Sequence, residues 1–148
     1  MRMTQQTDYA LRILLYLAVR PDQTCRVADV ADAFEVSRGH LLKIALRLKR
    51  LGHIQTARGR AGGIRLARAP EEIGIGALVR AIEGEFPLVE CLHARGGACV
   101  ISPACKMKAM FHEALDAYLA VLDSFTLADA ARNGAMLRPL LGLDRDAA

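Results

Sequence analysis

The segment Val27–Gly52, VADVADAFEVSRGHLLKIALRLKRLG, decides the fold of this 148-residue chain. Its apolar residues recur at the spacing of one helix face, first over 27–34 and then over 38–51. Ser37 is a typical N-cap residue, and Gly52 is of the type that commonly ends a helix. The segment therefore predicts two helices joined by a very short turn, which is the arrangement of a helix-turn-helix unit.

A further helix precedes this unit and a hairpin follows it. We expect the first helix to run from a cap at Thr4–Thr7 to about Arg20, with an apolar face of Leu11, Leu14, Leu15 and Ala18. Two short apolar runs, 54–57 and 64–67, flank a tip rich in glycine and arginine, which predicts a two-stranded wing. The fold class that we predict is mainly α: a winged helix-turn-helix with a two-stranded wing and a long C-terminal dimerisation helix.

The helix predicted over 38–51 has one apolar and one basic face. The apolar face, which we expect to be buried, consists of Leu41, Ile44, Ala45, Leu48 and Leu51. The basic face consists of His40, Lys43, Arg47 and Arg50. A helix of this kind can enter a major groove by its N-terminus. Arg38, Gly39 and His40 would then lie nearest the base edges, whereas Lys43 and Arg47 would contact phosphates.

The distribution of charge supports a nucleic-acid partner. Residues 1–68 contain 13 Lys/Arg against 5 Asp/Glu, a net charge of +8, and residues 69–148 contain 7 against 11, a net charge of −4. A basic half attracts polyphosphate, and Arg58 and Arg60 on the predicted wing tip are placed to reach a minor groove. The alternative is a solvated basic face without a partner, but a helix-turn-helix followed by a basic wing favours double-stranded DNA.

The second half of the chain is predicted to hold a short helix over 75–83 and a long helix over 103–123. The long helix carries an apolar stripe that one small subunit cannot bury: Met107, Met110, Phe111, Ala114, Tyr118, Val121 and Leu122, with Phe125 beyond it. We therefore expect a homodimer and a palindromic operator. Thr126 with Asp129 caps a last short helix that ends at 133–134, and we expect the tail after Leu140 to be disordered.

Three cysteines lie close together in the sequence, with seven residues between Cys91 and Cys99 and five between Cys99 and Cys105. The apolar run 9–19 is too short to span a membrane and lacks a signal-peptide cleavage site, so we expect a cytoplasmic protein with no membrane contact. Thiols stay reduced there, which favours a metal centre over a disulfide framework. The residues leave open an iron–sulfur cluster with one further ligand or a tetrahedral zinc completed by His93 or His112.

Several motifs are similar to those of one known family. They are Met1–Thr4, Thr7–Arg12, Val36–Ile44, Arg58–Leu66 and Ile101–Cys105, and the similarity covers about residues 1–130. On these motifs the chain resembles the iron–sulfur winged-helix transcription regulators related to NsrR, IscR and RirA. It looks closest to their nitric-oxide-sensing branch, which the segment Thr126–Asp129 also resembles.

The resemblance implies a homodimer with one [4Fe–4S] cluster per subunit. The three cysteines would be ligands, Asp8 of the partner subunit would be the fourth, and Arg12 would support that carboxylate. One branch of the family has a histidine three residues after its last cysteine; Lys108 stands at that position here, which fits an oxygen ligand instead. The spacing between the first two cysteines is looser than in many relatives, which keeps a [2Fe–2S] cluster open. The alternative role of Asp8 is an ordinary ion pair with Arg12.

The resemblance also implies a transcriptional repressor that senses nitric oxide through its cluster and releases its operator on nitrosylation. An iron or iron–sulfur-status repressor of the same architecture is the alternative. Two hypotheses from other classes are a zinc-stabilised DNA-binding module and a small electron-transfer protein. No Ser/His/Asp constellation, phosphate-binding loop or paired-carboxylate pattern indicates an enzyme.

The predicted elements divide the chain into three parts. Residues 1–70 form the winged helix-turn-helix domain, residues 71–102 the short helix and cluster-binding loop, and residues 103–148 the dimerisation helix and C-terminal tail. Cys25 lies outside the cysteine-rich loop, and we expect it to be a small core residue.

Overall fold

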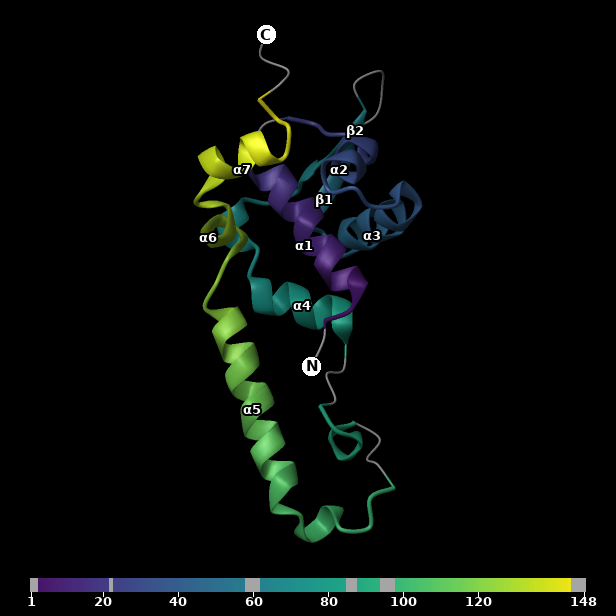
Figure 1. Cartoon of the computed structure of the whole chain (residues 1–148), viewed down its shortest axis with the longest axis vertical. Coiled ribbons are helices and arrows are strands. Elements are labelled where there is room, and N and C mark those ends of the chain that lie inside the picture. The colour runs from purple at the N-terminus through teal and green to yellow at the C-terminus, as the bar shows by residue number, and fades with distance from the viewer. Residues whose placement is uncertain (1–2, 22, 58–61, 85–87, 94–97, 145–148) are drawn as a thin grey trace.

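The computed structural model describes residues 3–21, 23–57, 62–84, 88–93 and 98–144. It consists of a helical head and a long helix that stands away from the head (Figure 1). In chain order the elements are α1 (Gln5–Ala18), α2 (Val27–Ala33), α3 (Arg38–Arg50), β1 (Ile54–Ala57), β2 (Gly63–Leu66), η1 (Pro70–Glu72), α4 (Ile75–Glu83), η2 (Glu90–Leu92), η3 (Ser102–Ala104), α5 (Lys106–Asp123), α6 (Leu127–Ala131) and α7 (Gly134–Leu140). The predicted fold class, a mainly helical winged helix-turn-helix, is confirmed.

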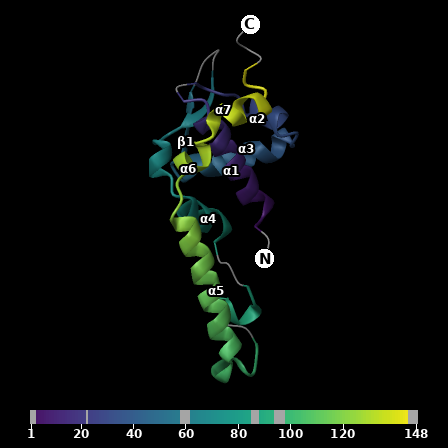
Figure 2. The ribbon, with the colours of Figure 1, turned by 60° about the vertical axis from the view of Figure 1, so that its left-hand side comes forward.

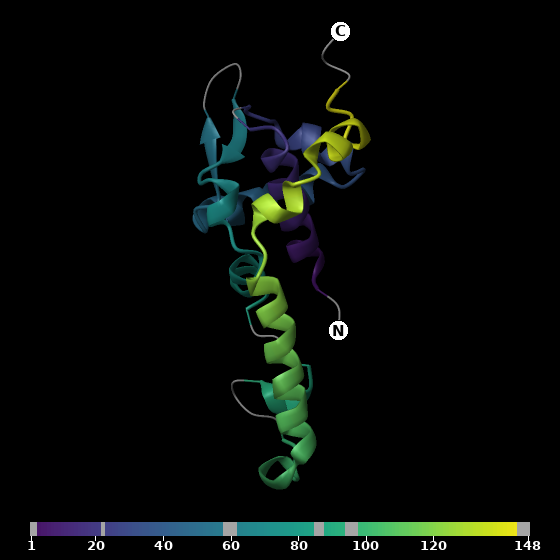
Figure 3. The same cartoon turned by 90° about the vertical axis from the view of Figure 1, so that its left-hand side faces the viewer.

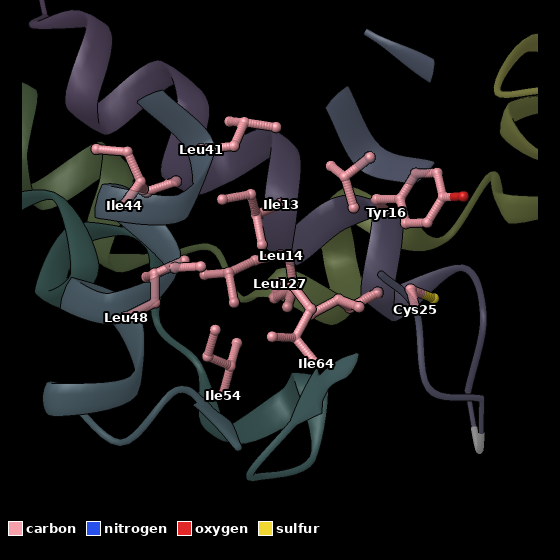
Figure 4. Packing of buried hydrophobic residues seen from close by; sticks show 14 of the residues in the cluster. Ile13, Leu14, Tyr16, Cys25, Leu41, Ile44, Leu48, Ile54, Ile64 and Leu127 are labelled. Carbon is pink, nitrogen blue, oxygen red and sulfur yellow. The ribbon is translucent and has the colours of Figure 1, made fainter. Parts of the chain in front are cut away.

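The core of the head forms around α1, as Figure 4 shows. The buried apolar residues of this helix are Ala10, Ile13, Leu14, Tyr16 and Leu17. The predicted face was partly wrong, because Leu11, Leu15 and Ala18 are only half-buried and Ile13 and Leu17 take the central positions. The core is completed from α3 by Leu41, Ile44, Ala45 and Leu48, as predicted, whereas Leu51, which was also expected to be buried, is only half-buried. The buried faces of α1 and α3 thus pack against each other, and the opposite side of α3 faces solvent.

The turn between α2 and α3 is as short as the sequence predicts. Glu35 has a φ of 52°, a left-handed conformation, and the Val36 N–H donates to the Ala31 carbonyl at 3.0 Å. Ser37 occupies the N-cap of α3, although its side chain makes no capping hydrogen bond among the described residues. Gly52, with a φ of 75°, ends the helix as predicted.

The wing is an antiparallel pair in which Ile54 lies opposite Leu66 and Ala57 opposite Gly63. Cys25 extends this ladder by one bridge: its N–H donates to the Ile64 carbonyl at 2.9 Å, and the Ile64 N–H donates back at 2.8 Å. The Cys25 side chain is 1% exposed, which confirms it as a core residue. Arg58 and Arg60 lie outside the described residues.

The C-terminal segment returns to the head, which the sequence analysis did not anticipate. The Leu127 N–H donates to the Ile73 carbonyl at 2.8 Å, and the Leu127 side chain is 1% exposed. A further helix, α7, follows α6, and Leu143 beyond it is buried against the core. The prediction that the last helix ends at 133–134 was therefore wrong. The prediction of a disordered tail after Leu140 was wrong for residues 141–144, which the structure describes.

Helix α5 extends from the head as a stalk, which the rotated views show most clearly (Figures 2 and 3). The structure describes every residue of α5, and none of them is buried. At its C-terminal end Asp123 accepts two hydrogen bonds from Arg80 of α4, at 2.5 and 2.6 Å. None of the described helices is both long and apolar enough to cross a membrane.

Candidate nucleic-acid interface and cysteine loop

The exposed side of α3 combines cationic and apolar side chains. Arg38, Gly39, Lys43 and Arg50 are exposed, and their contacts with DNA stay a prediction. Two leucines that the sequence analysis assigned to neither face, Leu42 and Leu46, are 47% and 50% exposed between these residues. The exposure of Leu42 and Leu46 could have been predicted from the sequence, because neither residue falls on the helix face formed by the buried apolar residues of α3. The exposed surface of the helix is therefore cationic at its borders and apolar along its middle.

The remaining two residues of the predicted basic face turn toward the N-terminal end of α1. The rings of His40 and Tyr9 lie 6.5 Å apart. Arg47 donates to Gln6 Oε1 at 2.7 Å and to the Ala81 carbonyl of α4 at 3.1 Å. His40 and Arg47 thereby line an open groove of about 340 Å³ between α1 and α3. Because Arg47 is engaged within the chain, its predicted contact with phosphate stays a prediction.

Hydrogen bonds fix the wing beside α3. Lys49 Nζ donates to Thr56 Oγ1 of β1 at 3.1 Å, and Arg68 Nε donates to the Gly52 carbonyl at 3.1 Å. Arg65 is exposed on β2, opposite Gln55. The sequence analysis did not single out Lys49, Arg65 and Arg68. The exposure of Arg65 could have been predicted, because side chains alternate between the two faces of a strand and its neighbours Ile64 and Leu66 are apolar. The three cations add positive charge to the side of the head where the wing lies.

The segment between α4 and α5, the cysteine loop, carries Cys91, Cys99 and Cys105, and its short helix η2 packs against α5 (Figure 3). Cys91 lies in η2 and is half-buried, Cys99 is exposed, and Cys105 is the half-buried N-cap residue of α5. All four cysteines of the chain are described, and none forms a disulfide. Burial in the core raises the pKa of the Cys25 thiol.

The donor chemistry of the loop fits an iron–sulfur cluster, because its three thiols are free and reachable from solvent. Among the described residues of one chain, however, no three Cys, His, Asp or Glu side chains are gathered so that they could hold a metal ion. His112, an alternative zinc ligand, shares an open groove with Cys105 and Lys108 but lies 3.2 Å from Asp116 Oδ2. The part of the chain that the structure describes therefore does not by itself bring the predicted ligands together.

Asp8, the predicted fourth ligand, is in the first turn of α1, and its side chain is 47% exposed on the head. Its carboxylate forms the expected ion pair with Arg12, at 2.8 Å. The Arg12 guanidinium also lies over the rings of Tyr9 and Phe34, 5.8 and 5.6 Å from their centroids. Arg12 thus holds the Asp8 carboxylate at the surface and connects it to the end of α2. A metal-binding role for Asp8 stays a prediction.

Comparison with known proteins places this architecture among transcription regulators. Residues 3–133 match the model of the family described as "Rrf2: Iron-dependent Transcriptional regulator". The HTH-type transcriptional regulator NsrR of Geobacillus kaustophilus is 50% identical over 142 residues, 95% of this chain and 97% of that protein. NsrR of Bacillus subtilis is 46% identical over the same shares of the two chains.

Solved structures agree with these relatives. The structure of CymR, the global cysteine regulator of B. subtilis, matches with a TM-score of 0.70 and 25% identity, over 90% of this chain and 98% of that one. The structure of IscR from T. potens matches with a TM-score of 0.73 over 90% and 88% of the two chains. At 22% identity the IscR structure supports the fold alone.

Proposed function

The chain belongs to the Rrf2 family of transcriptional regulators, and we propose that it is a homodimeric repressor that senses nitric oxide through an iron–sulfur cluster. As a family member it is a DNA-binding regulator and not an enzyme. The signal, the cluster and the residues that carry them are the proposed part. The relatives named NsrR, which match nearly the whole chain, and the three free thiols of the loop support this proposal.

For DNA binding we assign the direct contacts to α3 and the wing. Arg38, Gly39 and His40 at the start of α3 would face base edges, where an arginine can donate two hydrogen bonds to guanine. Lys43 and Arg50 would neutralise phosphates, with affinity that falls as salt rises. Arg47 would keep the ends of α1 and α4 in place through Gln6 and Ala81, or exchange those contacts for a phosphate. Arg58 and Arg60 would reach the minor groove.

The exposed stripe on α5 supports the homodimer. Met107, Met110 and Val121 are 57%, 54% and 60% exposed, and Phe125 just beyond the helix is 50% exposed. A continuous apolar surface of this kind marks a site of protein contact. A second copy of the same helix supplies a matching apolar face, as a two-fold interface requires. Two recognition helices related by that axis would read a palindromic operator.

A dimer would also serve the cluster, because the described residues of one chain do not gather three possible ligands and a partner subunit would supply a further one. Cys91, Cys99 and Cys105 would hold one [4Fe–4S] cluster per subunit, with Asp8 of the partner subunit as the fourth ligand; a [2Fe–2S] cluster is the alternative. When bound, the cluster supplies iron with which nitric oxide can react. Arg12 would orient the Asp8 carboxylate, because it pairs with that group while its guanidinium lies over the ring of Phe34 at the end of α2. An iron or iron–sulfur-status signal acting on the same residues is the second candidate.

Native mass spectrometry of the protein purified without oxygen tests the proposal. We expect a dimer carrying one [4Fe–4S] mass per chain, whose iron becomes nitrosylated and whose operator affinity falls when nitric oxide is added. Cys99→Ala should abolish the iron content, whereas Cys25→Ala, which removes the one cysteine outside the loop, should retain it. A zinc-sized mass, or operator binding that ignores nitric oxide, would refute the signal and leave the family assignment intact.

A further inference from the structure

We propose that Leu42 and Leu46 select operator sequence by contacting the 5-methyl groups of two thymines in the major groove. The inference rests on the proposed entry of α3 into that groove. It extends the proposed function, which assigns sequence readout to hydrogen-bonding residues alone. The observation that carries it is the exposure of both leucines, 47% and 50%, on the side of α3 that faces away from the core.

The two leucines form one apolar patch because they are four residues apart on a helix and thus share a face. Four residues also correspond to a rise of about 6 Å along the helix axis. Successive base pairs of DNA are separated by about 3.4 Å, so the patch spans about two base steps. The spacing therefore fits two methyl groups on adjacent or next-to-adjacent base pairs.

The surroundings of the patch identify DNA as its occupant rather than an apolar protein surface. Lys43 follows Leu42, and Lys49 and Arg50 lie three and four positions after Leu46, so cations border the patch. Arg38, at the start of the same helix, is exposed as well. A polyanion with an apolar strip in its groove complements this pattern. The major groove of DNA has that property wherever a thymine presents its C5 methyl group.

A leucine contact with a methyl group carries sequence information because no other standard DNA base presents a methyl group in the major groove. Arg38 can recognise guanine, whereas Leu42 and Leu46 have no hydrogen-bonding atoms and would favour A·T pairs. The helix would thus combine two chemistries, a polar one at its N-terminus and an apolar one along its middle. We expect operator half-sites with thymines at two positions facing the middle of α3.

The test uses uracil in place of thymine, because this change removes only the methyl group. The full-length protein, purified without oxygen, first selects its site from a randomised duplex library. Each thymine of the selected site is then replaced by uracil, one position at a time, and the dissociation constants are measured. We expect two positions per half-site at which uracil weakens binding about fourfold, roughly the effect of removing one buried methyl-sized group.

Leucine variants connect these positions to the patch. In Leu42→Ala or Leu46→Ala, one of the two positions should become insensitive to the loss of the methyl group. Leu140→Ala is the matched control, because Leu140 is 80% exposed on α7 and should leave the uracil pattern of the wild type unchanged. All three leucines are exposed, so the substitutions should spare the fold.

Three outcomes would overturn the inference. One is a selected site whose uracil substitutions all leave affinity unchanged, and another is a wild-type uracil pattern in both leucine variants. The third is a change in the mass of the free protein in the leucine variants, which would assign the patch to a second copy of the chain. If no duplex is selected at all, the proposed repressor function fails along with this inference. A duplex that is selected but shows no effect of uracil refutes the inference alone.

Discussion

The Oε1 atom of Glu83 lies 2.8 Å from the backbone nitrogen of Thr4, so the last residue of α4 accepts a hydrogen bond from the start of α1. The same oxygen accepts hydrogen bonds from the hydroxyl groups of Thr4 and Thr7. Glu83 immediately precedes the segment that leads to Cys91, and Asp8 lies one turn after Thr4. The carboxylate therefore joins the beginning of the cysteine loop to the end of α1 that carries Asp8.

Removing this carboxylate should destabilise the head. In Glu83→Ala the hydroxyl of Thr7, a residue that is 0% exposed, loses its hydrogen-bond partner. We expect the free energy of unfolding to fall by about 1–3 kcal/mol, which is typical when a buried polar group is left unsatisfied. Urea denaturation measures this change, and Glu113→Ala on the exposed surface of α5 is the control. Equal stability of the two variants would contradict the role of Glu83.

The same site predicts a dependence on pH. Partial burial by itself raises the pKa of Glu83, but hydrogen bonds from Thr7 and Thr4 and the positive charge of Arg47 outweigh it, and the pKa is lowered. A carboxyl group with a lowered pKa in the fold stabilises the protein above its unfolded pKa, and this contribution is lost as the pH falls through the folded value. The stability difference between wild type and Glu83→Gln should therefore shrink toward acid pH. A difference that grows on acidification would show the opposite sign.

Local signals were sufficient to predict most of the head. The residues of α4 were predicted at both ends, and the capping box of α6 forms as expected, with the Thr126 N–H donating to Asp129 at 2.9 Å. Both features depend on residues within a few positions of one another. The same holds for the turn between α2 and α3. Where neighbours in the sequence determine the structure, the sequence was enough.

The errors arose where distant segments decide the structure. The segment 133–134 has the composition of a helix end, yet α7 begins there, and Arg138 of this helix donates to the Val19 carbonyl, 119 residues away, at 3.1 Å. The contacts of Arg47 with Gln6 and Ala81 depend equally on the packing of α1 and α4. The described residues of one chain do not gather the three cysteines into a metal site, and the proposed fourth ligand belongs to a partner subunit.

The return of the C-terminal segment predicts that the head needs residues well beyond the wing. Leu127 lies in the core, so Leu127→Ala should lower the free energy of unfolding by about 2–5 kcal/mol, the usual range for a buried leucine. Leu140→Ala, at an exposed position, should change it by less than about 0.5 kcal/mol. Thermal or urea unfolding distinguishes the two. An equally small loss of stability in both variants would mean that α6 does not stabilise the head. That result would agree with the predicted division of the chain, in which residues 1–70 form the DNA-binding domain by themselves.

The close approach of α4 and α5 depends on a glycine. A Cβ atom on Gly76 would overlap Asp123 Oδ1 and lie 2.9 Å from the Asp123 backbone nitrogen, so the backbone of α5 would have to move. We expect Gly76→Ala to lower the free energy of unfolding by about 1–3 kcal/mol, the usual cost of overpacking. Gly134→Ala is the control, because its added methyl group would make only an ordinary 3.6 Å contact with Val19. Equal unfolding midpoints in the two variants would contradict the tight crossing.

If α5 forms the dimer interface, a charged side chain placed on its apolar stripe should weaken the dimer. Met110 and Val121 are exposed on the apolar stripe of one chain, and a carboxylate placed there would be buried without a partner in the dimer. Met110→Glu or Val121→Glu should therefore shift the mass in sedimentation equilibrium from two chains toward one. Glu113→Lys, which changes a charge at an exposed position outside the stripe, should leave the dimer intact. Because a monomer presents only one recognition helix, both stripe variants should also lose affinity for a palindromic site while keeping the helix content of the wild type. A dimer that tolerates both carboxylates would place the interface elsewhere on the chain.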